Sequence, residues 1–175
     1  MAKFKLTKEQ REFLKNLDEN QKQFVIENYK RDWEYENSLE GIKDNLGCLQ
    51  VGHNLEVVIV KTLQNLPRKV RNFVYKNCAF TSIPEAGGQA LCKQKIKRPW
   101  LIILDYEADE NTVAHEIAHA WLGHKIEFPD MLPSIEWIYR IEKEACEQAT
   151  KWGFKSELEQ ELIEAYKSQK RKNVT

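Results

Sequence analysis

The first part of the chain carries apolar residues at helical spacing within a highly charged background. The pattern predicts two helices over residues 7–46, with Gly41 and Gly47 near their end. Because charged residues dominate this segment, we expect it to pack outside the main core, as an N-terminal helical extension over residues 1–54. The apolar positions are Phe13, Leu14, Leu17, Phe24, Val25, Tyr29 and Trp33.

A helical hairpin and three apolar runs are predicted in the middle of the chain. The hairpin covers residues 54–77 and breaks at residues 65–67, where Pro67 suits the first position of the second helix. The apolar runs that follow have β-strand composition, and turn-forming or basic residues separate them. They are CAFTSI (78–83), the weaker QALCKQ (89–94) and WLIILDY (100–106), which is the clearest strand of the three.

Helical periodicity returns after the strands. Asp109 or Asn111 can cap the first of the later helices, and Gly153 can end the second in a left-handed conformation. Helices, then a small sheet, then helices predict an α+β fold with a mostly antiparallel sheet, in a domain over residues 55–175. The predicted segments are a helix from Asp109 to about Lys125, a loop over 128–134, a helix over 134–152 and a charged helix over 156–171.

The charge balance argues against a protein that coats nucleic acid. The chain has 27 basic and 27 acidic residues, so its formal net charge is zero. Basic residues concentrate only at Lys93–Arg98 and Lys167–Lys172, and we expect both segments to be solvated. Nucleic acid is therefore not an expected partner.

Cysteine usage and hydropathy predict a cytoplasmic protein. The first residues lack the apolar run of a signal peptide, and no stretch reaches the roughly 20 apolar residues of a membrane span. Cys48, Cys78, Cys92 and Cys146 form no CxxC pair. In a reducing compartment, free thiols are the simplest interpretation, rather than disulfides or a cysteine zinc site.

Two histidines lie four residues apart in the sequence HEIAH, at residues 115–119. At this spacing, His115 and His119 share one face of a helix and can bind one zinc ion. Glu116 is expected to act as general base, removing a proton from a water that the zinc activates. This helix is apolar over most of its surface, so its polar side chains need a partner, which a metal supplies. The alternative is a pair of hydrogen-bonded histidines without a metal.

A catalytic zinc site needs a third protein ligand. Lys125 stands where a histidine ligand ten residues after the first would lie, and no histidine follows His124. Glu142 lies within an apolar stripe of helix 134–152, where an isolated carboxylate is unfavourable unless it meets a cation. We therefore expect Glu142 to be the third ligand. Glu144, which should face solvent, is the alternative ligand, and Glu142 could instead be a carboxylate at the rim of the interface.

These residues resemble the gluzincin metallopeptidases, which carry HExxH on one helix and a glutamate in ExxA(D/N) on a later one. Over roughly residues 55–154, the chain is most similar to the small ImmA/IrrE-type and minigluzincin domains, through HEIAHAWLGH and the segment Glu142–Cys146. The resemblance implies zinc-dependent hydrolysis of a protein or peptide substrate, which binds as an extended chain at an edge strand. Cys146 departs from the pattern, because relatives often have an Asp or Asn there that would orient a ligand histidine.

Several features of the mechanism are left open. Tyr139, His124 and His53 are candidates for stabilising the transition state, although such a tyrosine is usually a core residue. His124 lies about 140° around the helix from His119, so we expect a supporting or packing contact for it. The main alternative to an enzyme is a metal-bearing regulatory or binding protein with the same fold. Specificity would depend on loops 84–98 and 126–134, and the oligomeric state is not predicted.

Overall fold

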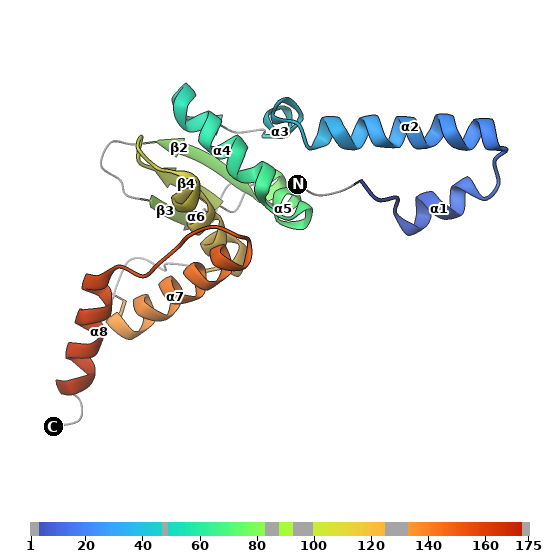
Figure 1. Ribbon diagram of the computed structural model, residues 1–175. Helices are drawn as coiled ribbons and strands as arrows, with labels where there is room; N and C mark the ends of the chain where they lie inside the picture. The colour runs from blue at the N-terminus through green and yellow to red at the C-terminus, as the bar shows by residue number, and fades with distance from the viewer. Residues whose placement is uncertain (1–3, 47–48, 83–87, 93–99, 125–132, 173–175) are drawn as a thin grey trace. The chain divides into compact units, whose positions relative to one another are not determined.

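The chain folds into two compact units. A computed structural model describes residues 4–46, 49–82, 88–92, 100–124 and 133–172 (Figure 1). The units are Met1–Asn45 and Leu46–Thr175. The second unit begins before the predicted boundary at 54/55, because the short strand β1 (Leu49–Gln50) pairs with the sheet of that unit.

The N-terminal unit is helical, but it contains three helices where two were predicted. Capping boxes begin the first two helices, one at Thr7 with Gln10 and one at Asp18 with Gln21. Asn37 ends the second helix, and its side chain donates a hydrogen bond to the Trp33 carbonyl. The helices are α1 (Lys8–Leu14), α2 (Glu19–Glu36) and α3 (Leu39–Asn45).

In the second unit, β1 is followed by two helices, α4 (His53–Asn65) and α5 (Arg68–Asn77), over the range predicted as a helical hairpin. The break falls at Leu66 and Pro67, as the sequence indicates. Pro67 takes the position just before α5, where its missing N–H costs no intrahelical hydrogen bond. The two predicted helices and the break between them are confirmed, but α4 and α5 make little contact with each other, so they do not form a packed hairpin.

The described residues of this unit form a four-stranded sheet in the order β1-β2-β4-β3. Its longer strands are β2 (Cys78–Ser82), β3 (Gly88–Cys92) and β4 (Trp100–Leu104). The prediction of a mostly antiparallel sheet is wrong. β1 with β2 and β2 with β4 are parallel pairs, and only β3 with β4 is antiparallel. Helices α4 and α5 supply the long crossover that the parallel pair of β1 and β2 needs. The sequence pattern did not predict β1.

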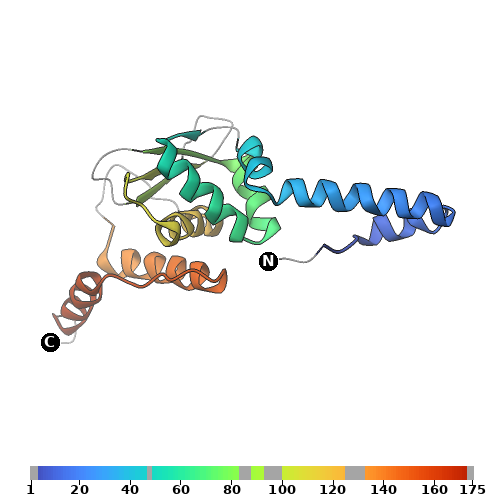
Figure 2. The same cartoon turned by 45° about the horizontal axis from the view of Figure 1, so that its top comes forward.

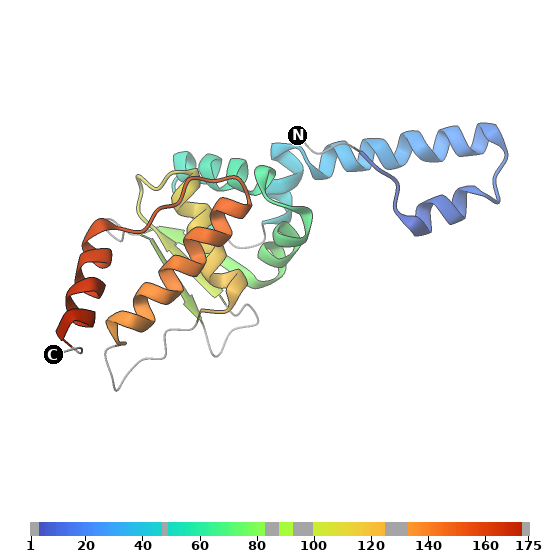
Figure 3. The same cartoon turned by 60° about the horizontal axis from the view of Figure 1, so that its bottom comes forward.

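Helix α6 (Glu110–Leu122) lies between the sheet and helix α7 (Ile135–Lys151) (Figures 1 and 3). It also packs beside α4 (Figure 2). The sheet, α4 and α7 contact α6 on several sides, which explains its apolar composition. Burying apolar surface around the helix lowers the free energy of the folded state. Its residues Val113, Ala114, Ile117 and Ala118 are fully buried, as are Phe80 and Ile102 of the sheet.

Local signals in the sequence set the ends of α6 and α7. Asp109, not Asn111, caps α6 by accepting a hydrogen bond from the Thr112 backbone N–H. Ser134 caps α7, which ends as predicted at Gly153, where φ is +96°. The last helix, α8 (Gln160–Lys172), starts four residues later than predicted and packs on α7.

Some predictions fall on residues that the structure does not describe. They include the basic segment Lys93–Arg98, most of the loop over 128–134, and most of the loops that were expected to set specificity. Within the described ranges, no helix combines the length and apolar character needed to cross a membrane.

Replacing Gly153 should test the left-handed end of α7. Gly153→Ala is expected to lower the free energy of unfolding by about 1 to 2 kcal/mol, because a Cβ is unfavourable at positive φ. The space around this position is open, so steric crowding is not the cause. Gly153→Asn should cost less, since asparagine tolerates this conformation. Chemical denaturation of both variants measures the difference, and an alanine variant as stable as the parent would contradict the assignment.

Candidate metal centre

Two helices bring together the three side chains that the sequence predicts as metal ligands. His115 and His119 lie one turn apart on α6, and Glu142 reaches them from α7. The Nε2 atoms of the two histidines are 3.0 Å apart. Glu142 Oε2 lies 3.0 Å from Nε2 of His115 and 3.4 Å from Nε2 of His119. This group could therefore hold one metal ion, with one ligand atom from each residue.

The separations among these atoms suit a shared ion. Ligand atoms that surround one ion tetrahedrally at about 2.0 to 2.1 Å lie about 3.3 Å from one another. The three observed separations lie between 3.0 and 3.4 Å. The predicted third ligand, Glu142, is the one that the structure brings to the histidines, and it comes from a different helix later in the sequence.

The electrostatics of the triad favour a proton between His115 and Glu142, where a metal ion would otherwise bind. Burial lowers the pKa of His115, but hydrogen bonds to Cys146 and Glu142 outweigh it and raise this pKa to about 10. Burial raises the pKa of Glu142, but hydrogen bonds to His115 and His119 outweigh it and lower this pKa to about 2. In the metal-free protein at neutral pH, a protonated His115 therefore faces an ionised Glu142.

Ser156 supports the far side of the His115 ring. Its hydroxyl lies 3.0 Å from Nδ1 of His115, and the Cys146 sulfur lies 3.7 Å from the same atom. Sequence reasoning assigned this supporting position to residue 146 and did not identify Ser156. Once His115 has lost a proton, a hydrogen bond from its Nδ1–H to Ser156 leaves the lone pair on Nε2, the nitrogen that faces Glu142.

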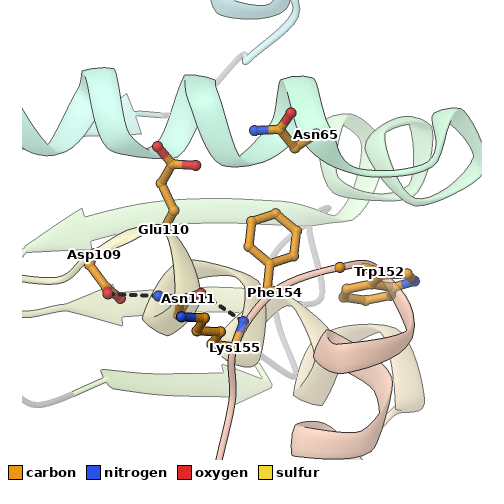
Figure 4. A pocket seen from close by; sticks show the side chains of 8 residues that line it. Asn65, Asp109, Glu110, Asn111, Trp152, Phe154 and Lys155 are labelled. Carbon is orange, nitrogen blue, oxygen red and sulfur yellow. Dashed lines mark hydrogen bonds between the residues drawn. The ribbon is translucent and has the colours of Figure 1, made fainter. Parts of the chain in front are cut away.

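The segment that carries Ser156 is fastened to the start of α6. Phe154 is buried, and the backbone N–H of Lys155 donates to the Asn111 side-chain oxygen at 2.8 Å. Asn111 in turn donates to Asp109, the residue that caps α6 (Figure 4). These residues line a pocket beside the start of α6, so its polar side chains already serve to connect this segment to the helix. The sequence signal for Ser156 is weak, because its position depends on this tertiary hydrogen bond.

His124 lies against the other ligand histidine. Gly123 adopts φ +75° and ends α6, so the chain turns back and the helical angle predicted for His124 no longer applies. Nδ1 of His124 lies 3.0 Å from Nδ1 of His119, and its Nε2 lies 3.1 Å from Glu144 Oε2. Burial lowers the pKa of His124. Glu144 is therefore a partner of His124, and Glu142 occupies the ligand position.

Glu116 is buried next to the triad, with 6% of its surface exposed. Burial raises the pKa of its carboxyl group, although the nearby charges of His119 and His115 act in the opposite direction. Among the residues that the structure describes, none donates a hydrogen bond to this carboxylate. A buried acid of this kind is suited to exchanging protons with a bound water or substrate.

Tyr139 and His53, which the sequence suggested for transition-state stabilisation, make their observed contacts away from the triad. The ring of Tyr139 stacks on Tyr166 of α8, with 4.1 Å between ring centroids, which indicates a packing role. His53 is exposed at the first position of α4. Cys78 and Cys146 are buried and neither forms a disulfide, as expected.

No family model matches the chain, and no curated protein or solved structure matches it. The interpretation of the site consequently depends on its geometry and its donor chemistry.

Removing the Ser156 hydroxyl should weaken metal binding. We expect Ser156→Ala to lower the affinity for a divalent transition-metal ion by about 10- to 100-fold, because loss of a partner behind a ligand histidine has effects of this size. Competition with a chromophoric chelator measures the affinity. Ser168→Ala, at an exposed position of α8, is the matched control and should bind as the parent does. Equal affinity of the two variants would show that Ser156 does not support the site.

Metal binding should release a proton. Near pH 7, His115 must lose the proton that its raised pKa retains, whereas Glu142 is already ionised. We expect about one proton to be released for each metal bound, and the affinity to rise by about tenfold for each pH unit between about pH 6 and pH 8. Calorimetric titration in buffers of different ionisation enthalpy counts the protons. Release of none would contradict the protonated His115.

Proposed function

We propose that the chain is a zinc-dependent metallopeptidase that hydrolyses peptide bonds of a protein or peptide substrate. The observation that carries this proposal is the convergence of His115, His119 and Glu142 beside the buried carboxylate of Glu116. Three ligands and one adjacent acid are the groups that metal-assisted hydrolysis requires.

The donor set favours zinc over the harder divalent cations. Calcium and magnesium take mainly oxygen ligands, whereas two imidazoles and one carboxylate are a common catalytic zinc set. Three protein ligands also leave one coordination position for water or substrate. When bound, zinc supplies Lewis acidity, which polarises a carbonyl group and makes water more acidic.

Glu116 is the residue that we assign to proton transfer. Its carboxylate accepts a proton from the attacking water as the new C–O bond forms at the scissile carbonyl carbon. The resulting carboxylic acid then donates that proton to the amine nitrogen as the C–N bond breaks, so Glu116 returns to its ionised form. The raised pKa of Glu116 supports this role, because a base works best when its pKa approaches the ambient pH.

The open edge of the sheet suits an extended peptide. Among the described strands, β3 pairs only with β4, and it packs against the helix that carries His115 and His119. An edge strand offers unpaired backbone N–H and C=O groups, to which a peptide can add as a further strand. We propose this edge as the place where the substrate backbone binds.

The alternative is a metal-bearing regulatory or binding protein of the same fold, and Cys146 was the reason to consider it. The hydrogen bond between Ser156 and His115 weakens that reason, because Ser156 takes the supporting position that Cys146 leaves without a carboxylate or amide. The two functions differ in whether the Glu116 carboxylate is needed.

Glu116→Gln should separate these functions. In an enzyme, we expect it to retain zinc while lowering peptide hydrolysis by at least about 100-fold, since general-base catalysis contributes that much. Metal content is measured by elemental analysis, and cleavage by mass spectrometry of a mixed peptide library. His115→Ala should lose zinc and activity together, and Glu147→Gln, at an exposed position of α7, should lose neither.

Two outcomes would contradict the peptidase proposal. One is a Glu116→Gln variant that cleaves as fast as the parent. The other is a zinc-loaded parent that cleaves no peptide of the library, which would favour the binding protein. A parent without zinc affinity would refute both.

A further inference from the structure

We propose that His124 and Glu144 form a positioning pair that fixes the tautomer of His119 and so prepares its Nε2 atom for the metal. The pair does not touch the metal position; it acts through His119. This inference rests on the metal site of the proposed function, but it does not depend on the substrate or on peptide hydrolysis.

The hydrogen bonds along this chain of residues allow one assignment of protons for neutral imidazoles. Glu144, when ionised, can only accept hydrogen bonds, so Nε2 of His124 carries a proton and donates it across 3.1 Å. A neutral His124 then has a lone pair on Nδ1. The facing Nδ1 of His119, 3.0 Å away, must therefore be the donor.

This assignment determines which nitrogen of His119 can bind a metal. A neutral imidazole carries one proton, and in His119 that proton lies on Nδ1. Nε2 of His119 is therefore left with its lone pair, and this is the atom that lies 3.4 Å from Glu142 Oε2. The two ligand histidines are thus supported differently, His115 by the hydroxyl of Ser156 and His119 by a second imidazole backed by a carboxylate.

Burial makes the contact between the two imidazoles strong. The side chains of His119 and His124 are 9% and 8% exposed, whereas that of Glu144 is 50% exposed. Hydrogen bonds removed from water are less weakened by competition with solvent. The negative charge at the outer end polarises both imidazoles and increases the basicity of the ligand nitrogen.

The connection also explains two features that the metal triad leaves without a role. Gly123 turns the chain so that His124 returns to the ligand helix. Glu144, two residues after Glu142 on the same helix, would otherwise be an ordinary exposed acid. Helix α7 therefore contributes to both histidines of the site, to the metal side through Glu142 and to the outer side of His119 through Glu144.

Zinc affinity tests the proposal without any measurement of catalysis. Chelator competition is carried out with the full chain and its variants His124→Ala, His124→Asn and Glu144→Ala. We expect His124→Ala to weaken zinc binding by about 10- to 100-fold. His124→Asn should restore part of the loss, because its side-chain oxygen can accept the hydrogen bond from His119. Glu144→Ala should weaken binding by a smaller factor.

Two comparisons separate positioning from general electrostatics. Glu147→Ala removes the same charge from an exposed position of α7 and should leave the affinity unchanged. The double variant His124→Ala with Glu144→Ala should bind zinc as His124→Ala does, because Glu144 acts through His124. Additive losses in the double variant would overturn the proposed connection.

The tautomers provide a second readout that a merely structural role would not change. In nitrogen-correlated NMR spectra of the zinc-loaded protein, His119 should carry its proton on Nδ1 and His124 on Nε2. If His124→Ala does not fold, these spectra of the parent and the affinity of Glu144→Ala still decide. The opposite tautomer in His124, or unchanged affinity in Glu144→Ala, would refute the inference.

Failure of this inference can be distinguished from failure of the proposed function. A parent protein that binds no zinc refutes the metal site, and the positioning pair with it. A parent that binds zinc, together with His124 and Glu144 variants that bind it equally well, refutes the positioning pair alone. Loss of hydrolysis in Glu116→Gln bears only on the peptidase.

Discussion

The structure of the site depends on the packing of α6 against α7, which places one carboxylate against two imidazoles in a largely buried interface. Burying ionisable groups costs free energy unless they are paired, so Glu142 and the two histidines constrain one another. The sheet on one side of α6 and α7 on another hold the helix, and the ligand spacing follows from that arrangement. A proton or a metal ion can each satisfy the interface, and this competition links metal affinity to pH.

The Nδ1 atom of each histidine in the triad, which points away from Glu142, is contacted by a residue that follows the end of a helix. Ser156 comes after the end of α7, and His124 comes after the end of α6. In both cases a glycine with positive φ ends the helix and redirects the chain. The contacts that support the two histidines therefore come from irregular segments, each of which directly follows a helix. This explains how a chain with Cys146 in place of an acid or amide can still orient His115.

Short-range signals in the sequence were the reliable ones. The cap at Asp109, one of two predicted candidates, the break at Pro67 and the end of α7 at Gly153 depend on local chemistry, and each lies where it was predicted. The ligand triad was also predictable, since helical spacing aligns the histidines and an acid within an apolar stripe needs a cation. Strand pairing was not, because parallel or antiparallel order depends on contacts between distant segments. The same limit hid Ser156, whose position depends on the hydrogen bond from the Lys155 backbone N–H to Asn111. It also hid the contact of His124, which follows the end of α6 and does not keep the helical angle used to predict its position.

The two residues between Gly153 and Ser156 form a short connection of fixed length. The side chain of Phe154 is buried in the core, and the backbone N–H of Lys155 donates to Asn111 of α6. The position of this segment therefore depends neither on side-chain charge nor on regular secondary structure. An insertion here would leave every helix and strand intact while moving the hydroxyl away from His115. The fold and the proposed metal affinity would therefore be separable properties of this chain, because a change of loop length alone would remove the second.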